Sequence, residues 1–317
     1  MKENKKLVFC TGGTGGHVFP AVSLYESLKK NKYQIFFITD KRCEYILKES
    51  EINYKIIHVS HFNKKKIYWL FSFITIIRSV ITCIILFIKN RPDLIVGFGG
   101  YVSFPGLFSA KILKIPFVIH EQNAVMGKAN RVLSNFAKCI ALTYKKTRYC
   151  KLSKNVIHTG MPIRDFFYKD YKKKKLKNKK KILILGGSQG AAIFSELLPA
   201  LFKELDSKIR KKISISQQVI TDEKEKLARV YENLKIEHNL KTFFKNINEE
   251  IFDADLIISR CGASTLAEIE IFPIPIFLFP LPNSRNDHQY ENAKNFSKNK
   301  ECIIFNEQNL NKKKIFR

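Results

Sequence analysis

Short apolar runs alternate with segments of helical periodicity along most of this chain. The runs that resemble buried strands occupy residues 7–10, 93–96, 115–119, 181–185, 255–259, 276–279 and 302–305. The segments with apolar residues three or four positions apart occupy residues 18–30, 103–113, 191–205 and 263–272. Continuous apolar runs that alternate with helices are typical of parallel strands covered on both faces. The pattern therefore predicts an α/β fold built from βαβ units.

Glycine is scarce in this chain and is concentrated where the predicted strands end. There are 14 glycines in 317 residues, about 4% against about 7% in an average protein. Most fall within residues 12–16, 97–106 and 186–190, each time between a strand and a helix. Glycine permits sharp turns and a close approach of the backbone to a ligand. Because the strand–glycine–helix unit opens twice, we predict two Rossmann-like, doubly wound domains that face each other across a cleft.

A lysine-rich segment separates the two predicted domains. Most of residues 169–181 are lysine, which is typical of an exposed linker. A length of 317 residues also suits two domains of about 150 residues each. We therefore predict a first domain at residues 1–165, a linker at 166–180 and a second domain at 181–317.

The net charge of the chain is strongly positive. Lysine and arginine number 56 against 28 acidic residues, which gives a formal charge of +28. This excess suits an anionic partner, such as a nucleic acid, a membrane surface or a phosphorylated substrate. The lysine runs carry few aromatic residues that could stack on bases, so no nucleic-acid partner is predicted. A compositional bias toward lysine on solvated faces is the alternative explanation of the charge.

The seven cysteines are scattered along the chain and form no CxxC pair. This spacing argues against a structural zinc site and favours a reducing, cytosolic compartment. The first residues contain only a very short apolar stretch before the glycines, so no secretory signal is predicted.

Residues 67–88 form a long apolar stretch in which Arg78 is the one charged residue. The stretch is long enough to span a bilayer. A span would, however, separate the strand at 93–96 from the strand at 7–10, although both are expected in one sheet. Basic residues flank the stretch at 64–66 and 89–91, which favours an interfacial helix on an anionic membrane surface. A buried core helix and a true span remain the alternatives.

The apolar stretch also has two predicted faces. Small polar residues recur three or four positions apart and form a narrow stripe: Ser72, Thr75, Ser79 and Thr82. We expect part of this helix to pack on the sheet. The apolar residues expected to face outward are Trp69, Phe73, Ile77 and Val80.

Glycine-rich turns that lead into helices are candidate anion sites, because free backbone N–H groups and the helix dipole point at the ligand. Neither turn matches a nucleotide-binding fingerprint: in a GxGxxG frame from Gly13 the last glycine falls on Val18, and no Gly-Lys-Ser/Thr follows. Asp40, at the end of the next strand, keeps a nicotinamide enzyme as an alternative. Asp253 and Asp255 form a DxD pair, but they precede their strand. We therefore predict no metal ion and expect helix N-termini to neutralise a diphosphate instead.

Two polar motifs stand at predicted carboxyl ends of strands. His17 closes the first glycine turn at the start of a helix, where the dipole favours a neutral imidazole that could serve as a base. The sequence HEQN at residues 120–123 directly follows the apolar run at 115–119. A structural histidine and an ordinary surface turn are the alternatives for these two motifs.

Taken together, these motifs resemble the MurG family of peptidoglycan N-acetylglucosaminyltransferases, which have the GT-B fold. The resemblance rests on GGTGGH at 12–17, GGYVS at 99–103, HEQN at 120–123, GGSQG at 186–190, RCGA at 260–263 and DHQ at 287–289. These motifs follow one another in the family's order, between about residues 7 and 305.

The resemblance implies an inverting transfer of N-acetylglucosamine from UDP-N-acetylglucosamine to the C4 hydroxyl of lipid I, forming lipid II. Lipid I is undecaprenyl-pyrophosphoryl-N-acetylmuramoyl-pentapeptide. The resemblance also implies a peripheral location on the cytoplasmic face of the bacterial inner membrane, no cofactor and no metal. Two alternatives stay open, a GT-B synthase that glycosylates diacylglycerol and an inactive membrane-associated scaffold.

Carried over residue by residue, the resemblance assigns His17 as the catalytic base and Glu121 as a second acid–base candidate. It implies substrate contacts in the first domain for Thr14, Gly15, Gly16, Tyr101, Asn123 and Arg164. It implies diphosphate and α-phosphate contacts in the second domain for Ser188, Ala263, Ser264, Thr265, Leu266 and Ala267. Phe244 is placed beside the uracil, Glu268 on the ribose, and Gln289 and Asn292 on the sugar hydroxyls.

The chain departs from the family pattern at three places. Cys261 stands where the family usually has serine, and Phe244 replaces a smaller aliphatic residue. The family also continues through further helices beyond the position of Arg317. We expect the loss of these helices to loosen the closure between the two domains or to leave apolar surface on the second one.

Overall fold

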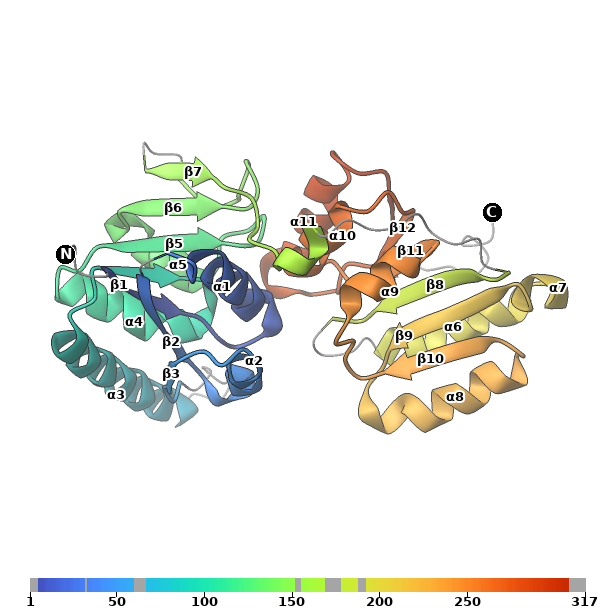
Figure 1. The fold of residues 1–317 in the computed structure, drawn as a ribbon, viewed down its shortest axis with the longest axis horizontal. Helices are drawn as coiled ribbons and strands as arrows, with labels where there is room; N and C mark the ends of the chain where they lie inside the picture. Colours follow the sequence, from blue (N-terminus) through green and yellow to red (C-terminus); the bar gives the residue numbers. More distant parts are fainter. Residues whose placement is uncertain are drawn as a thin grey trace. The chain divides into compact units, whose positions relative to one another are not determined.

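The computed structural model describes residues 5–31, 33–59, 67–151, 155–168, 178–187 and 192–307. The chain divides into two compact units, Met1–Asp165 and Phe166–Arg317, and each contains one parallel β-sheet (Figure 1). The predicted α/β class is confirmed in both units. The predicted linker at 166–180 falls largely outside the described residues.

The first unit contains a seven-stranded sheet in the order β3-β2-β1-β4-β5-β6-β7. The strands are β1 Lys5–Cys10, β2 Tyr33–Thr39, β3 Tyr54–Ile56, β4 Leu94–Gly97, β5 Phe117–Glu121, β6 Cys139–Leu142 and β7 Val156–His158. The helices are α1 Gly15–Leu28, α2 Glu44–Glu49, α3 Ile67–Asn90, α4 Gly100–Ile112 and α5 Lys128–Leu133. Short 3₁₀ turns cover Lys41–Cys43 and Ser134–Phe136, and a third, Asp165–Tyr168, spans the boundary between the two units.

Both faces of the first sheet are covered because its strands alternate apolar side chains between them. On β1, Leu7 and Phe9 pack with the helices α1 and α2, whereas Val8 and Cys10 pack with α3, α4 and α5. This explains why the strands read as continuous apolar runs rather than as an alternating pattern.

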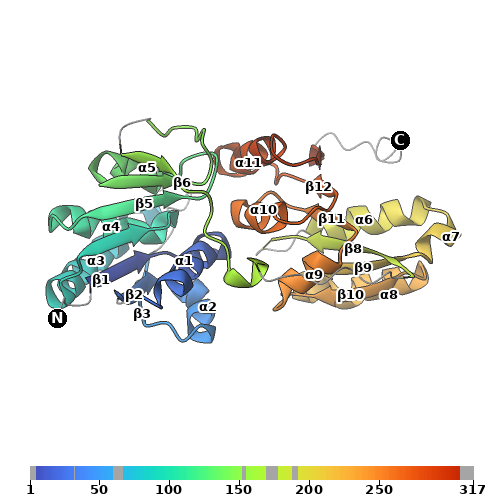
Figure 2. The ribbon, with the colours of Figure 1, turned by 45° about the horizontal axis from the view of Figure 1, so that its top comes forward.

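The second unit contains a six-stranded parallel sheet in the order β10-β9-β8-β11-β12-β13. The strands are β8 Lys180–Leu185, β9 Ile213–Gln218, β10 Glu237–Lys241, β11 Leu256–Ser259, β12 Ile276–Leu278 and β13 Ile303–Ile304. The helices are α6 Ala192–Glu204, α7 Ser207–Arg210, α8 Lys224–Asn233, α9 Ile247–Asp253, α10 Ala263–Glu270 and α11 His288–Phe296. Helices α6 and α8 share one core with the sheet, and α10 packs beside α11 (Figure 2).

Each sheet reverses its strand order at one point. In the first unit the reversal lies between β1 and β4, and in the second unit it lies between β8 and β11. Ligands of open parallel sheets bind outside the carboxyl ends of the strands at such a switch point. The glycine turns that follow β1, β4, β8 and β11 stand at these places.

The predicted strands are confirmed, with shifts at their ends. Helices α1 and α4 begin at Gly15 and Gly100, three residues before the predicted starts, because the glycine turns continue directly into the helices. Strand β5 continues to Glu121 instead of ending at residue 119, because His120 and Glu121 pair with β6. Five further strands, β3, β6, β7, β9 and β10, were not among the predicted runs. Strands β9 and β10 carry mostly polar residues, β3 and β7 are three residues long, and β6 is a four-residue apolar run that the pattern missed.

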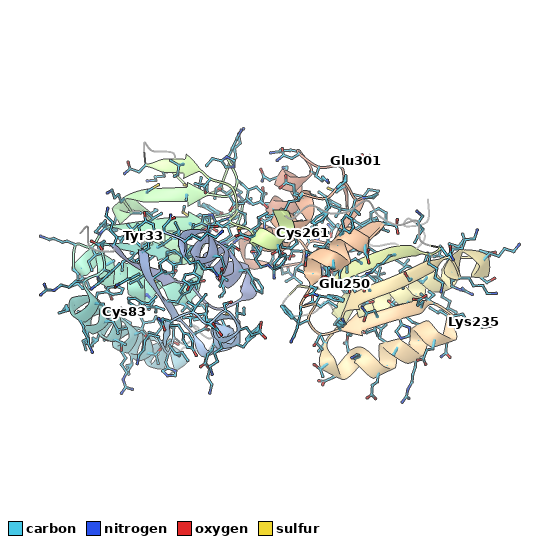
Figure 3. The ribbon with its side chains drawn as sticks, in the orientation of Figure 1. Tyr33, Cys83, Lys235, Glu250, Cys261 and Glu301 are labelled. Carbon is cyan, nitrogen blue, oxygen red and sulfur yellow. The ribbon has the colours of Figure 1, made fainter. Side chains whose placement is uncertain are left out.

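Helix α3 has the two faces that the sequence predicts. Ser72 and Ser79 are buried on the inner face. The fully buried Cys83, labelled in Figure 3, lies on the same face. Phe73 and Ile77 are exposed, as predicted. The residues that extend this outer row are Ile74, Ile81, Ile85 and Ile88.

The prediction for Val80 is wrong. Val80 is half-buried because it lies on the side of α3 that contacts α4, where its carbonyl oxygen accepts a hydrogen bond from the Ser109 hydroxyl at 3.1 Å. The side chain of Trp69 lies outside the described part of the structure.

Within the described residues, α3 contains one segment, Ser72–Asn90, that is long and apolar enough to cross a membrane. The register of the sheet opposes that role, since β1 pairs with β4 from Leu7↔Leu94 to Cys10↔Gly97. The chain therefore enters and leaves α3 within one sheet. This arrangement fits a helix that lies on a surface better than a span.

Gly106 of α4 is predicted to be indispensable for the packing of the first core. A Cβ at this position would overlap the Sγ of Cys10 on β1, and it would also touch Phe87 of α3. We expect Gly106→Ala to lower the free energy of unfolding by about 1–3 kcal/mol, because overpacking outweighs the gain in helix propensity. Urea denaturation followed by circular dichroism measures the change.

The variant Cys10→Ala provides the matched test of this cause. Removal of the Sγ opens the space that a methyl group at residue 106 needs. The double variant Cys10→Ala/Gly106→Ala should therefore be more stable than additivity of the two single changes predicts. Full additivity would contradict the packing argument.

Candidate functional site

The glycine turn after β1 is held in place by a buried carboxylate. Asp40 follows β2, and its Oδ1 accepts a hydrogen bond from the backbone N–H of Gly13 at 3.0 Å. Its Oδ2 pairs with Arg42 at 2.7 Å and accepts a bond from the Tyr101 hydroxyl at 3.3 Å. With both oxygens engaged inside the first unit, Asp40 has a structural role. This argues against the ribose-binding role that a nicotinamide enzyme would require.

The turns after β1 and β4 contact each other through Gly100. Its φ of +71° favours glycine. A Cβ at Gly100 would meet the carbonyl oxygen of Gly12 at 3.1 Å and Cδ2 of His17 at 3.3 Å. The two turns and the imidazole of His17 therefore form one packed cluster at the switch point of the first sheet.

His17 lies in the first turn of α1 as its third residue, three positions after the N-cap Thr14 and next to the exposed Gly16. No acidic residue occupies this turn, so the positive end of the helix dipole is not neutralised there. The Nδ1 of His17 lies 3.0 Å from Oε1 of Gln122, which comes from the end of β5. The first turn of α1 thus presents the positive end of the helix dipole and one oriented imidazole.

Glu121 does not have the geometry of an acid–base residue, which corrects that sequence prediction. Its side chain is 2% exposed. One oxygen accepts from the backbone N–H of Asn123 at 3.0 Å, and the other accepts from Gly127 N at 3.0 Å and from Asn130 Nδ2 at 2.8 Å. This carboxylate fixes the loop after β5, because each oxygen is already committed to the loop's donors.

The remaining predicted residues of the first unit surround this cluster. Asn123 is half-buried and its side-chain amide lies 3.4 Å from Glu121. The guanidinium of Arg164 lies over the ring of Phe19 on α1, 4.7 Å from its centre. The ring of Tyr101 lies beneath Arg42 at 5.1 Å. The structure thus brings Arg164 and Tyr101 to helix α1 and its preceding turn.

In the second unit, the turn after β11 leads into helix α10 with Gly262 as the N-cap. The first turn has no acidic residue, and Ser264 and Thr265 are half-exposed. Leu266 does not fit the predicted ligand role. Its side chain is fully buried, and its backbone N–H bonds to the carbonyl of Gly262. Ala263, Ala267 and Glu268 belong to the same helix, with Glu268 8% exposed.

Gln289 and Asn292 support the turn after β11 rather than standing free of it. The Oε1 of Gln289 accepts from Cys261 N at 3.1 Å and from Leu281 N at 3.0 Å. Asn292 is fully buried and its Nδ2 donates to the carbonyl of Cys261 at 3.1 Å. The side chain of Asn292 therefore lies beneath this turn, and its predicted contact with a sugar hydroxyl stays a prediction.

Arg260 is a buried residue of this turn whose role the sequence did not identify. Its guanidinium donates to the carbonyls of Phe279 and Pro280 and pairs with Glu307. It thereby links the turn after β11 to the segments that follow β12 and β13. Contacts between positions this far apart have no signature in local sequence.

Two further predictions concern the nucleotide. The side chain of Phe244 is 4% exposed, so it packs in the core, and a uracil could meet only its backbone. Ser188 lies outside the described residues.

Asp253 and Asp255 lie at the amino end of the second sheet, as predicted. Asp255 accepts a hydrogen bond from the backbone N–H of Lys181 at 2.8 Å, which gives it a structural role. No cluster of three or more His, Cys, Asp or Glu side chains suited to a metal ion occurs among the described residues.

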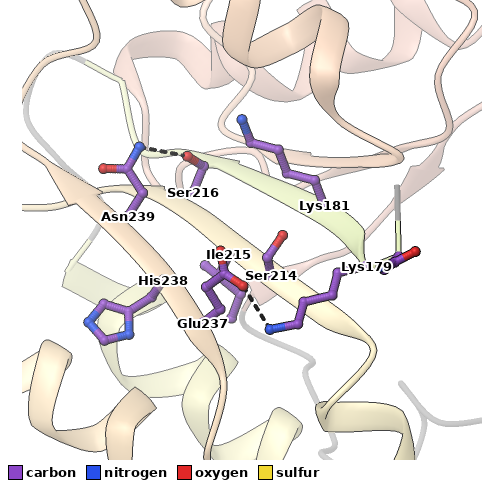
Figure 4. Close-up of a pocket in the computed structure, with 9 residues that line it drawn as sticks. Lys179, Lys181, Ser214, Ile215, Ser216, Glu237, His238 and Asn239 are labelled. Atoms are coloured by element: carbon purple, nitrogen blue, oxygen red, sulfur yellow. Dashed lines mark hydrogen bonds and ion pairs between the residues drawn. The ribbon is translucent and has the colours of Figure 1, made fainter. Parts of the chain in front are cut away.

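A shallow cavity of about 460 Å³ opens on one face of the second sheet, away from the glycine turns (Figure 4). Lys179 pairs with Glu237 at 2.7 Å, and Lys181 pairs with Glu250 of α9 at 2.7 Å. Because these charges are paired with each other, the cavity offers no excess charge to a ligand. The helix N-termini at the switch points are the better candidates.

The sequence matches known proteins over nearly its whole length. Residues 7–142 match the glycosyltransferase family 28 N-terminal domain, and residues 181–317 match the family's C-terminal domain.

Relatives with similar sequences are transferases with one shared name. The chain is 41% identical over 298 residues to the UDP-N-acetylglucosamine--N-acetylmuramyl-(pentapeptide) pyrophosphoryl-undecaprenol N-acetylglucosamine transferase of Rickettsia bellii, covering 92% of this chain and 83% of the relative. It is 35% identical over 311 residues to the enzyme of that name from a Wolbachia of Brugia malayi, covering 97% and 87%. Among solved structures, Acinetobacter baumannii MurG superposes with a TM-score of 0.77 at 26% identity, covering 98% and 89%.

Glu121→Gln is predicted to destabilise the first unit. The introduced NH₂ group would face N–H donors in place of an acceptor, in a site that excludes water. We expect the free energy of unfolding to fall by about 1–3 kcal/mol, measured by thermal and urea denaturation. Glu301→Gln, at an exposed position before β13, is the matched control and should leave the melting temperature unchanged. Wild-type stability of the Glu121 variant would refute the positioning role.

Proposed function

Because this chain belongs to glycosyltransferase family 28, we propose that it transfers N-acetylglucosamine from UDP-N-acetylglucosamine to the C4 hydroxyl of lipid I and forms lipid II. The relatives described above carry this activity in their names. The two matched domains are the family's N-terminal and C-terminal domains. The first unit would bind the acceptor, and the second unit would bind the UDP-sugar.

The reaction needs a base for the hydroxyl and positive potential for the departing diphosphate. The acceptor oxygen attacks C1 of the donor sugar while its proton passes to Nε2 of His17. The bond from C1 to the diphosphate oxygen breaks, and its electron pair leaves with UDP, so the configuration at C1 inverts. Aligned N–H donors stabilise charge that develops in the transition state, a task suited to the first turn of α10.

One observation carries the catalytic part of the proposal. His17 is half-buried at the switch point, with Nδ1 held by Gln122 and the ring packed on Gly100. Among the described residues, no hydrogen-bond partner of Nε2 is found. An imidazole held this way is oriented to act as a general base.

The outer face of α3 supports a peripheral location on an anionic membrane, the cytoplasmic face of the inner membrane for a lipid I-consuming enzyme. Phe73 is 57% exposed, Ile81 50% and Ile85 61%. Exposed apolar patches of this kind mark sites of membrane or protein interaction. Lys89 and Arg91 flank the helix on its carboxyl side and would favour anionic headgroups.

The activity test compares two acceptors. We expect the purified chain to convert UDP-N-acetylglucosamine and lipid I to lipid II, and to leave diacylglycerol unmodified. Product from diacylglycerol alone would instead identify a glycolipid synthase. Absence of both products, with the donor still bound in calorimetry, would favour the scaffold.

His17→Ala is expected to lower kcat by about 10²–10⁴-fold, the contribution of a general base. Calorimetry should show unchanged binding of UDP-N-acetylglucosamine, since His17 lies in the acceptor-side unit. Circular dichroism controls for folding. A variant with wild-type kcat would exclude His17 as the base.

The double variant Ile81→Glu/Ile85→Glu tests the membrane surface. Loss of two apolar side chains from a lipid-facing helix should weaken binding to phosphatidylglycerol vesicles by about 10²-fold or more. The matched control, Ile209→Glu/Ile271→Glu, changes two exposed isoleucines of the second unit and should bind like the wild type. Equal loss in both double variants would contradict a role specific to α3.

A further inference from the structure

We propose that Gln122 and His120 fix the tautomer of His17, so that Nδ1 carries the hydrogen and Nε2 carries the lone pair. Neither residue would touch substrate, so both are positioning residues. The tautomer follows from the geometry of the first unit alone. Its consequence for catalysis rests on the proposed glycosyl transfer.

Three hydrogen bonds connect four groups in a row. Nδ1 of His17 lies 3.0 Å from Oε1 of Gln122, and Nε2 of Gln122 lies 3.1 Å from Nδ1 of His120. Nε2 of His120 lies 3.1 Å from the carbonyl oxygen of Gly160. The groups come from α1, the loop after β5, β5 itself and the segment after β7.

The far end of this row determines its direction. A carbonyl oxygen only accepts hydrogen bonds, so Nε2 of His120 must donate to Gly160. Burial lowers the pKa of His120, which keeps its ring neutral near pH 7. A neutral ring has one N–H group, so Nδ1 of His120 accepts a hydrogen bond from Gln122.

A second carbonyl fixes the same orientation independently. Nε2 of Gln122 also lies 3.2 Å from the carbonyl oxygen of His120. Because this oxygen can only accept, the atom of Gln122 that faces it must be the amide nitrogen. The amide oxygen of Gln122 therefore faces His17, and Nδ1 of His17 must be the donor.

Packing leaves this arrangement little freedom to reverse. Gln122 is 1% exposed, so its amide cannot exchange a protein partner for bulk water. A Cβ at Gly99 would come within 3.3 Å of Oε1 of Gln122 and 3.5 Å of Cε1 of His17. Because Gly99 has no Cβ, the turn after β4 can pack closely against the amide of Gln122 and the ring of His17.

The row orients His17 but does not conduct protons. An amide does not exchange its N–H protons during turnover, and the Gly160 carbonyl ends the row as an acceptor. When Nε2 takes the proton of the acceptor hydroxyl, Nδ1 keeps its hydrogen bond to Gln122. A neutral amide here has the orienting role that a carboxylate has in a serine protease triad.

Nitrogen-15 NMR of the full chain, labelled at histidine, tests the tautomer directly. Loss of signals in His17→Gln identifies the resonances of His17. We expect a protonated, pyrrole-like Nδ1 and a pyridine-like Nε2 in the neutral ring. A protonated Nε2 in the neutral wild-type ring would overturn the proposal.

Gln122→Leu removes the acceptor opposite Nδ1 with little change in size. We expect the resonances of His17 to move toward a mixture of tautomers, and kcat to fall by about 10²-fold, with KM for the donor unchanged. Gln122→Glu keeps an acceptor opposite Nδ1 of His17, so it should retain the tautomer. Its second carboxylate oxygen would face Nδ1 and the carbonyl oxygen of His120 in place of a donor, so kcat should recover only in part. If Gln122→Leu does not fold, the wild-type and Gln122→Glu spectra still decide the question.

Gln218→Leu is the matched control, since Gln218 lies in the second unit and its amide donates to the carbonyl of Thr242. It should leave the spectrum of His17 and kcat unchanged. Failure of the two proposals can be told apart. The expected tautomer in a chain without transferase activity would refute the proposed function alone, and full activity with a protonated Nε2 would refute the role of Gln122 alone.

Discussion

Buried polar groups at the carboxyl edge of the first sheet have to satisfy one another, and the shape of the site follows from this constraint. Asp40 and Glu121 lie behind the turns and are nearly buried. Asp40 accepts from one backbone N–H group and Glu121 from two. A buried acceptor without donors would cost several kcal/mol, about the net effect of several ordinary hydrogen bonds. The loops can therefore adopt only conformations that supply those donors. The site is rigid because its supports are buried.

The same constraint separates supporting residues from reacting ones in both units. In the first unit the buried Gln122 orients His17, which is half-exposed. In the second unit the buried Arg260 and Asn292 hold the turn that begins α10, while Ser264 is half-exposed. Few groups are therefore left to contact substrate: the imidazole of His17, the N-terminus of α10 and the hydroxyl of Ser264. Such groups suit a leaving diphosphate, which requires aligned N–H donors.

Helix α3 has one face that packs in the core of the first unit and one face that is apolar and exposed. Its inner face places small residues such as Ser79 and Cys83 against the rest of the first unit, which allows close packing with α4. Its outer face leaves Phe73 and Ile85 exposed. Helix α3 connects two strands of one sheet and packs one of its faces on α4, so it cannot cross a bilayer without leaving the fold.

The sequence by itself determined the class of the fold, the two doubly wound sheets and the positions of the glycine turns. These features are local, since an apolar run, a glycine cluster and a helical period each lie within a few consecutive residues. It also placed His17 at a helix start. Only the tertiary structure decided that Glu121 supports a loop, that Leu266 and Asn292 face the interior, and that Gln122 meets His17 across 105 positions of chain. Those outcomes depend on which side chains the fold brings together and closes off from water, and no local pattern encodes that.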